Sequence, residues 1–457
     1  MSHRLAKGWA EIELGEHVYI AGRIGWRGLK ADEYKPAGPI FLSVPNLNHG
    51  DEVDFGKVYH ITQARYEESP EIQLRVGDTL LVKDGAGIGK LGFVANLPGP
   101  ATVNSSLLVV RPANELLENK YLFYYLKGPK FQQIALERIS GSATPHLFQK
   151  DIKKLQVLAP PRNEQRRIAA KLEALLGKVD ASQQRLAKIP VLLKRFRQSV
   201  LAAACSGRLT ADWREENPSD GTTEDDDLPR GWRRTTVEDL IPKGGIFDGP
   251  FGSNLKSDDY TESGVRVIRL ENIGQLRFIG EKETFISREK YETLKRHTVG
   301  EGDIIFASFI MEEVRACVLP KLSTKAIAKA DCFCLRPRPE LVDRQFLVFQ
   351  LISQKSYNML VEDVHGATRP RINTTQLRKL EVRVCPLPEQ QEIVRRVEGL
   401  FALADQLEVR LAKARGQVDK LTPSLLARAF AGQLVPQDPT DQPAEMLLER
   451  IRSPRKE

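Results

Sequence analysis

A long run of regularly spaced apolar residues, positions 168–200 with the sequence IAAKLEALLGKVDASQQRLAKIPVLLKRFRQSV, sets the architecture that we expect for this chain. Its apolar positions follow one another in steps of four and three, and only Ser182 interrupts the register. A repeat of 3.5 residues over about five heptads is typical of a coiled-coil helix. We therefore predict one helix here, roughly 60–65 Å long.

A second run with the same spacing begins at Ile393 and ends at Leu425. Because one chain carries both helices, each is the natural partner of the other, and the domain between them favours an antiparallel coiled coil. An interior proline costs about 3 kcal/mol, so Pro190 and Pro423 are expected to kink or break the two helices differently. The apolar positions assigned to the helix pair and to its protein partners are Ile168, Leu172, Leu175, Val179, Leu186, Leu193, Ile393, Val397, Leu400, Leu407, Leu411 and Val418.

The chain repeats itself at a constant offset of 225 residues. The pair Glu164-Gln165 returns at 389–390, the run Arg-Leu-Ala-Lys at 185–188 returns at 410–413, and Gly77-Asp78 returns at 302–303. The two copies are otherwise diverged. This pattern predicts a pseudo-twofold internal repeat with two related but different surfaces, which suits a ligand that is read in two unlike halves.

Each copy also contains a mixed region that precedes its long helix. Short β-like runs bounded by Gly, Pro and Asp indicate strands, and helical stretches are expected near residues 119–139 and 343–364. The predicted class is α+β, with two strand-rich domains alternating with two long helices. The expected boundaries are 1–160 for the first mixed domain, 161–210 for the first long helix, 211–230 for an acidic linker, 231–385 for the second mixed domain, 386–434 for the second long helix and 435–457 for a C-terminal tail.

Composition limits the class of protein without identifying it. The net charge of +8 and a pI of about 9.1 favour a polyanionic partner, although a slightly basic soluble protein would have the same values. No apolar run is long enough to cross a membrane, and the start of the chain has no signal peptide, so we expect a cytoplasmic protein. Cys332 and Cys334 have no second ligand pair nearby, so we expect no zinc site.

The glycine-rich loop at residues 87–92 has the spacing G-x-G-x-x-G. A dinucleotide site would need a helix directly after this loop, and residues 93–96 do not begin one. The remaining alternatives are a hairpin turn and a tight turn that presents Lys90 to a phosphate. The residue 225 positions later is Arg315, which is also basic and is a second candidate phosphate contact.

Catalytic chemistry is missing from the repeated positions. The Asn/Asp-Pro-Pro-Phe/Tyr tetrapeptide of amino-methyltransferases does not occur, and His146 is replaced by Arg371 in the second copy. We therefore expect a non-catalytic binding protein that holds no metal or cofactor. Polar loops at 249–256 and 366–373 are either ordinary surface turns or readers of base edges and phosphates. The candidate DNA contacts are Lys83, Lys90, Thr144, His146, Ser253, Asn254, Lys256, Arg315, Arg369, Arg371 and Asn373.

Several segments together resemble one family. They are GATRPRIN at 366–373, PLPEQQEI at 386–393 and KLTPSLLARAFAGQL at 420–434, with their counterparts at 160–168 and 197–209. The chain resembles the specificity subunit of type I restriction–modification systems. The resemblance covers almost the whole chain, but before Gly77 it is limited to the general layout, and the first copy lacks a counterpart of the loop at 249–253.

The resemblance implies a mechanism. Each mixed domain would be a target recognition domain that reads one half of a bipartite, asymmetric site on double-stranded DNA. The helix pair would set the spacer and dock two adenine methyltransferase subunits, which would bind S-adenosylmethionine and flip an adenine. Restriction subunits with ATP-driven motors and Mg would join the complex. The alternatives are a coiled-coil scaffold without DNA readout and a self-contained enzyme, whose catalytic motifs are missing here.

Overall fold

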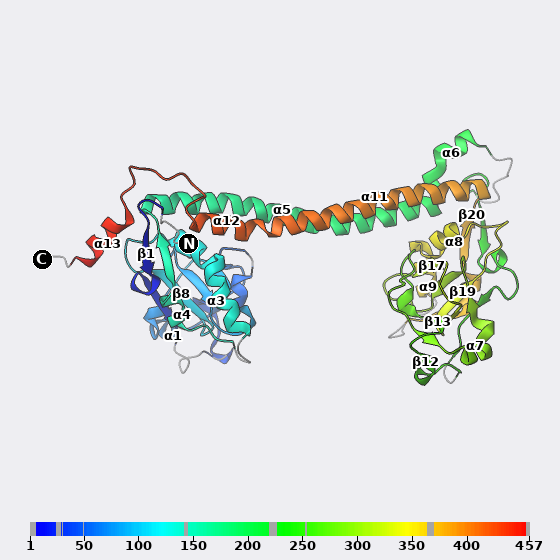
Figure 1. The fold of residues 1–457 in the computed structure, drawn as a ribbon, viewed down its shortest axis with the longest axis horizontal. Coiled ribbons are helices and arrows are strands. Elements are labelled where there is room, and N and C mark those ends of the chain that lie inside the picture. The colour runs from blue at the N-terminus through cyan, green and yellow to red at the C-terminus, as the bar shows by residue number, and fades with distance from the viewer. Residues whose placement is uncertain are drawn as a thin grey trace. The chain divides into compact units, whose positions relative to one another are not determined.

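The computed structural model describes residues 6–23, 29, 31–48, 50–140, 145–218, 226–251, 254–362 and 370–453. The chain forms two compact units (Figure 1). The first unit combines Met1–Ala187 with Lys413–Glu457, and the second is Lys188–Ala412. Each of the two long helical regions therefore contributes one part to each unit.

The first long helix, α5, spans Arg162–Cys205 without interruption, so of the two effects expected of Pro190, a kink or a break, the break does not occur. Proline has no N–H for the carbonyl four residues earlier, which is that of Leu186. The Arg415 guanidinium donates to this carbonyl instead (Nη2–O distance 3.0 Å). The carbonyl that the proline leaves free is thus satisfied by a side chain from the other long helix.

The second long helix is divided, as its proline predicted. Helix α11 spans Leu387–Asp419, and α12 spans Leu421–Phe430 after a turn at Lys420. Pro423 therefore lies in the first turn of α12, where backbone N–H groups have no intrahelical acceptor and a proline removes nothing.

The first unit contains an antiparallel four-stranded sheet and a smaller three-stranded sheet. The antiparallel sheet has the order β2 (Val18–Gly22), β8 (Leu107–Pro112), β5 (Thr79–Val82) and β6 (Leu91–Phe93). The three-stranded sheet has the order β4 (Tyr59–His60), β3 (Lys35–Leu42) and β7 (Ala101–Val103), with β3 and β7 parallel. A separate ribbon pairs β1 (Ala10–Glu13) with β9 (Gln156–Ala159), directly before α5.

Strand β5 explains why this sheet is buried on both faces. Leu81 belongs to the larger apolar core of the unit, whereas Leu80 and Val82 belong to a second core. Successive side chains of a strand point to opposite faces, so an uninterrupted apolar run fits a strand that is covered on both sides. The larger core also receives side chains from α2 (Asn119–Lys127), α3 (Pro129–Ser140), α4 (Gln149–Lys153), the beginning of α5, and α12.

The predicted C-terminal tail contains a packed helix, α13, which spans Ala444–Arg452. Leu447 and Leu448 are buried in the larger core of the first unit. The backbone N–H of Ala444 donates to the carbonyl of Gly8 (2.9 Å). This segment is therefore part of the first unit.

The second unit has the same kinds of element. One sheet has the order β11 (Ile246–Phe247), β19 (Cys332–Leu335), β16 (Ile304–Ala307) and β17 (Ala316–Val318). The other has the order β12 (Tyr260–Thr261), β14 (Phe285–Ile286), β13 (Val265–Ile268), β18 (Ala326–Ala328) and β15 (Thr298–Val299), with β13 and β18 parallel. A ribbon pairs β10 (Arg233–Thr236) with β20 (Glu381–Val384) before α11. The shorter helices are α6 (Ala211–Glu216), α7 (Arg288–Leu294), α8 (Arg344–Leu351), α9 (Gln354–Glu362) and α10 (Thr374–Lys379).

A buried glutamate fastens the start of each long helix to its domain. The indole N–H of Trp9 donates to Glu164 (Nε1–Oε2 distance 3.1 Å), and that of Trp232 donates to Glu389 (Nε1–Oε1 distance 3.1 Å). The following glutamines, Gln165 and Gln390, donate to backbone carbonyls that precede their own helices. The Glu-Gln pairs that stood out in the sequence thus have a structural role.

No helix in the described parts of the chain is long and apolar enough to cross a membrane. Within the same residues, no group of three or more His, Cys, Asp and Glu side chains is placed to hold a metal ion. All five cysteines are buried free thiols.

Candidate nucleic-acid interface

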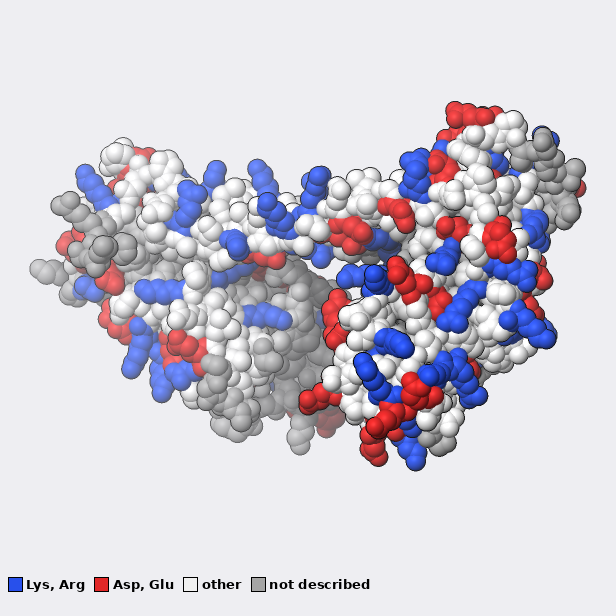
Figure 2. Space-filling view, turned by 45° about the vertical axis from the view of Figure 1, so that its right-hand side comes forward, with Lys and Arg blue, Asp and Glu red and all other residues white. Residues whose placement is uncertain are grey.

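Basic side chains are plentiful on the first long helix. Figure 2 shows Lys and Arg along the helical part of the molecule, and charges of both signs over the strand-rich domain that comes forward. The exposed basic residues of α5 are Arg166, Lys171, Lys178, Arg185, Lys188, Lys194 and Arg195. Such a stripe can attract a polyanion, but it carries no sequence information by itself.

A loop cluster at the end of β5 brings two of the predicted contact residues of the first unit together. Lys83 donates to the Asp84 carboxylate (Nζ–Oδ2 distance 2.9 Å), and the other oxygen of that carboxylate lies 2.5 Å from Nδ1 of His146. The His146 ring also packs edge-on against Phe148, with 4.5 Å between the ring centroids. Both polar side chains are part-exposed, and they share one carboxylate.

Two backbone hydrogen bonds place His146 at this position. The N–H of Gly85 donates to the Pro145 carbonyl (3.2 Å), and the N–H of Leu147 donates to the Lys83 carbonyl (2.8 Å). His146 therefore lies between two fixed points of the backbone, opposite Asp84.

The second unit builds the same frame around Arg371. The N–H of Ile310 donates to the Pro370 carbonyl (3.0 Å), and the N–H of Ile372 donates to the Ser308 carbonyl (3.0 Å). We call His146 and Arg371 the bracketed residues, because each lies between such a pair of hydrogen bonds.

The surroundings of Arg371 are aromatic and acidic. Its guanidinium lies over the rings of Phe251 and Phe309, at 5.5 and 5.8 Å from the ring centroids, and forms an ion pair with Asp331. The Arg371 side chain is 40% exposed, and Phe251 is 47% exposed. A cation held against aromatic faces has few orientations available to it.

The glycine-rich loop of the first unit connects β5 to β6, which are antiparallel neighbours. The hairpin interpretation is therefore confirmed, and no helix follows that could bind a pyrophosphate. Gly89 adopts a φ of +85°, and a Cβ at this position would lie 2.8 Å from the Cβ of Ala135. Lys90 is exposed and donates to the side chain of Asn48 (Nζ–Oδ1 distance 2.6 Å).

Two predicted contact residues of the second unit have partners inside the protein. The Arg315 guanidinium donates to the carbonyls of Leu270 and Ile273 (3.0 and 3.1 Å), which fixes the turn between them. The Asn373 side chain accepts the N–H of Gln376 (2.9 Å) as the N-cap of α10. These bonds account for both residues without a DNA contact.

The other predicted contacts are more dispersed. Asn254 and Lys256 are exposed beside a short 3-10 turn at Ser257–Asp259. Thr144, Ser253 and Arg369 lie outside the described residues. The loop clusters are organised by Asp84, Asp331 and Phe251, and none of the three was predicted as a contact residue. An apolar Phe251 within an otherwise polar loop was a signal that could have identified one of them.

The positions assigned to the helix pair differ in burial. Buried are Ile168, Leu172, Val179, Leu193, Ile393, Val397 and Leu411; half-buried are Leu175, Leu186, Leu400 and Val418; Leu407 is 40% exposed. Several of the buried positions lie in a domain core, since Ile168 and Leu172 pack in the first unit and Ile393 and Val397 in the second. Leu176, next to the predicted Leu175, is the buried residue of that turn.

Side chains of the two long helices also bond directly to each other within each unit. In the first unit, Gln183 donates to Asp419 (Nε2–Oδ1 distance 3.1 Å). In the second, Arg197 donates to Asp405 and Glu408 (2.5 and 2.7 Å).

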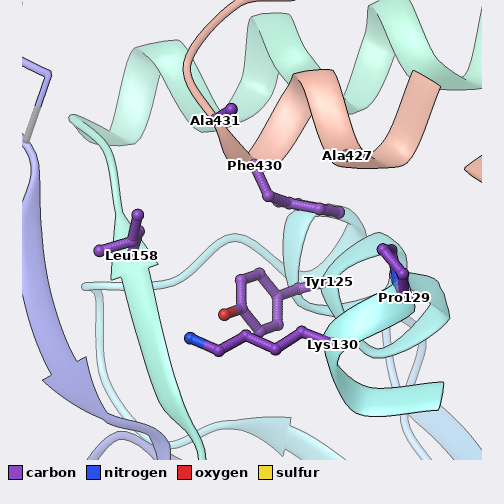
Figure 3. A pocket seen from close by; sticks show the side chains of 8 residues that line it. Tyr125, Pro129, Lys130, Leu158, Ala427, Phe430 and Ala431 are labelled. Atoms are coloured by element: carbon purple, nitrogen blue, oxygen red, sulfur yellow. The ribbon is translucent and has the colours of Figure 1, made fainter. Parts of the chain in front are cut away.

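Each unit has a small cavity beside its helices. In the first unit, Phe430 of α12 and Tyr125 of α2 line a cavity of about 200 Å³ (Figure 3), and their rings pack edge-on with 4.9 Å between the centroids. The second unit has a cavity of about 130 Å³. Each of the eight residues around the first cavity has a counterpart, 225 positions away, around the second. At corresponding positions the first lining has Tyr125 and Leu158 where the second has Gln350 and Arg383, so the two cavities do not offer one ligand the same contacts.

A known protein family matches most of this chain. The family model for the type I restriction modification DNA specificity domain matches residues 7–191 and 252–413, which is most of the chain. The chain belongs to this family. The resemblance to type I specificity subunits is thereby confirmed, and this membership agrees with the expectation of a non-catalytic subunit.

Sequence similarity to individual members of the family covers most of the chain. It is 31% identical to the type I restriction enzyme EcoDI specificity subunit of Escherichia coli, over 74% of this chain and 77% of that protein. It is 27% identical to the EcoKI specificity subunit of Escherichia coli strain K12, over 99% of this chain and 96% of that protein.

Solved structures of type I specificity subunits have the same fold. The HsdS subunit from Thermoanaerobacter tengcongensis superposes with a TM-score of 0.57 at 18% identity, over 94% of this chain and 99% of that one. A chain from a study of type I R-M complex assembly and conformational transition gives a TM-score of 0.67 at 19% identity, with the same coverage. The expected mixture of strand-rich domains and long helices is confirmed.

Proposed function

We propose that this chain is the DNA-recognition subunit of a type I restriction–modification complex. Each strand-rich domain would read one half of a bipartite, asymmetric site on double-stranded DNA. The observation that carries this proposal is the family match, which includes residues of both units. The alternative, a coiled-coil scaffold without DNA readout, is not favoured, because it leaves the match within the two strand-rich domains unexplained.

We propose the domain boundaries expected from the sequence, and the β-ribbons before the long helices support them. Recognition domains at 1–160 and 231–385 would each end with a β-ribbon strand, β9 or β20, directly before a long helix. The long helices would occupy 161–210 and 386–434, the acidic linker 211–230, and the tail with α13 435–457.

We further propose that α5 and α11 pair as an antiparallel coiled coil in a pseudo-twofold internal repeat. Hydrogen-bond partners support this arrangement inside each unit, because their residue numbers run in opposite directions. Position 183 bonds to 419 and 186 to 415 in the first unit, whereas 197 bonds to 405 and 210 to 389 in the second. The residues that line the two small cavities stand at corresponding positions, 225 residues apart, and this also supports the repeat.

The helix pair would set the spacer of the DNA site and dock two adenine methyltransferase subunits. Apolar side chains that remain exposed on these helices support a protein partner, because water does not favour them. In the second unit they are Val191, Leu192 and Phe196 of α5, and Leu403, Leu407 and Val409 of α11. A length change in both helices should alter the spacer, at about 3.4 Å of DNA axis per base pair.

The chemistry of modification and restriction would belong to partner subunits in the cytoplasm. The methyltransferase subunits would bind S-adenosylmethionine, and the restriction subunits would use ATP and Mg. The contribution of this chain would be contacts from Lys83, Lys90, His146, Asn254, Lys256 and Arg371, with Thr144, Ser253 and Arg369 as further candidates.

Genome-wide mapping of N6-methyladenine tests the proposal. The chain is co-expressed with its methyltransferase subunit in a host that lacks adenine methylation. We expect one bipartite motif with an unread gap, which disappears when this chain is omitted. A soluble complex that methylates no such motif would contradict the proposal and would favour the scaffold.

A further inference from the structure

The bracketed residues occupy one backbone frame in both units but carry different side chains. His146 and Arg371 lie 225 positions apart, and the same two backbone hydrogen bonds surround each of them. Both are part-exposed, with 36% and 40% of the side chain accessible. A fixed frame that presents different donors and acceptors fits a position that contacts a different base in each half of an asymmetric site.

Arg371 is held in one orientation before any ligand arrives. Its Cζ lies 5.5 and 5.8 Å from the ring centroids of Phe251 and Phe309, and Asp331 binds Nη2. The Asp331 carboxylate is itself positioned, because Ser308 donates to it (Oγ–Oδ1 distance 3.4 Å). A guanidinium has five N–H donors, and the ion pair leaves most of them available. Ordering the side chain in advance lowers the entropy cost of a later contact.

We infer that Arg371 is the specificity-determining residue of the second unit and that it selects a guanine in the major groove. Guanine presents two acceptors, N7 and O6, on its major-groove edge, and a guanidinium fork can bind both at once. Lysine or glutamine cannot supply the same planar pair of donors. This inference rests on the proposed function, because it names the base that the second recognition domain reads.

The contrast with His146 supports the assignment. In the tautomer in which Nδ1 donates its proton to Asp84, the Nε2 of His146 is left as an acceptor. An acceptor suits the amino group of adenine or cytosine and not the acceptor-rich edge of guanine. With that tautomer, the frame presents an acceptor in the first unit and donors in the second.

The experiment compares the complex that contains the natural chain, called here the unmodified complex, with complexes that contain Arg371→Lys or Arg371→Gln. Each is assembled with the methyltransferase subunit. The bipartite motif is first mapped through N6-methyladenine, and binding is then measured by competition between duplexes that differ at one base pair. We expect both variants to lose preference for guanine at one position of one half-site, by between about 5-fold and 150-fold. The other half-site should be unchanged. Arg277→Lys, an exposed arginine of the same unit, is the matched control and should retain the full motif.

A guanine analogue tests the contact directly. Replacing the selected guanine by 7-deazaguanine removes the N7 acceptor, so it should weaken binding by the unmodified complex and have little effect on Arg371→Gln. An unaltered motif in both variants, or equal sensitivity of all complexes to the analogue, would overturn the assignment. An unmodified complex that methylates no bipartite motif would instead contradict the proposed function, and the inference with it. Thermal unfolding of each variant establishes that the comparison is made between folded proteins.

Discussion

Buried carboxylates at the start of the long helices stabilise the fold at the scale of single residues. Glu389 accepts hydrogen bonds from the indole of Trp232, the hydroxyl of Thr210 and the guanidinium of Arg214. Burial raises the pKa of Glu164, and the hydrogen bond from Trp9 and the charge of Arg167 oppose this shift. Carboxylates near a helix N-terminus are also favoured by the helix dipole. The residues that the sequence repeats most clearly are thus structural.

The carboxylate of Glu392, three residues after Glu389, should make the stability of the protein depend on pH. Hydrogen bonds from Arg395 and then Arg396 lower the pKa of Glu392 from 4.5 to about 2. A lowered folded-state pKa contributes stability above the unfolded value of 4.5, and this contribution is lost as the pH falls toward 2. Glu392→Gln should therefore lower the free energy of unfolding at pH 7 more than at pH 3.5. Urea denaturation at both pH values measures this; an equal difference at both would contradict it.

The two basic residues that we first expected to contact phosphates should behave differently on mutation. Arg315→Ala removes the donor for two backbone carbonyls and should lower the free energy of unfolding by about 1–3 kcal/mol. Lys90→Ala removes one exposed side-chain hydrogen bond, so its effect on stability should stay within about 0.5 kcal/mol. Urea denaturation of the two variants provides the comparison. Equal stability losses would mean that Arg315 does not fix its turn.

At the scale of elements, the continuity of α5 depends on a contact that crosses from one helix to another. Pro190 leaves the Leu186 carbonyl without its usual backbone donor, and Arg415 replaces that donor. A helix pair can therefore tolerate a proline that an isolated helix would not, provided that the facing residue is a long cation.

A double-mutant cycle tests this account. Pro190→Ala restores a backbone N–H for Leu186 and should stabilise the protein by up to about 3 kcal/mol. Arg415→Ala should cost about 1 kcal/mol in the natural sequence and clearly less when Pro190 is already alanine. Urea denaturation of the four proteins gives the coupling. Additive effects would show that Arg415 does not compensate for the proline.

The C-terminal helix α13 should contribute measurably to the first unit. Leu447 is 8% exposed in the core, and its replacement by alanine should lower the free energy of unfolding by about 2–5 kcal/mol. Met446 is 55% exposed on the same helix, so Met446→Ala is a matched control that should change stability little. Chemical denaturation distinguishes the two variants, and similar small effects would mean that α13 is only loosely attached.

At the scale of the whole molecule, the core of each unit includes side chains from the long helical region of the other sequence repeat. The first core takes Leu426, Ala429 and Leu447 from the end of the sequence. The second core takes Val200 and Leu201 from the end of α5. Folding of each unit therefore requires a helix segment from the other half of the sequence.

Truncation exposes this dependence. A chain that ends at Ala412 keeps the residues of the second unit and loses α12 and α13 from the first. Hydrogen exchange should then accelerate by orders of magnitude in β5 of the first unit, while β16 of the second keeps its protection. Mass spectrometry of both strands in the full and truncated chains measures this. Unchanged protection of β5 would show that the first unit folds without the end of the chain.

The sequence by itself determined the long helices, the two diverged strand-rich domains and the family, because heptad spacing and short motifs are local and survive without coordinates. Only the tertiary structure decided what individual side chains do. Arg315 binds the carbonyls of residues 45 and 42 positions away, and Arg415 reaches a carbonyl 229 positions away. Asp84 and Asp331, which orient the bracketed residues, come from strand ends remote from them in the chain. Such partners depend on how distant segments pack, and no local pattern specifies them.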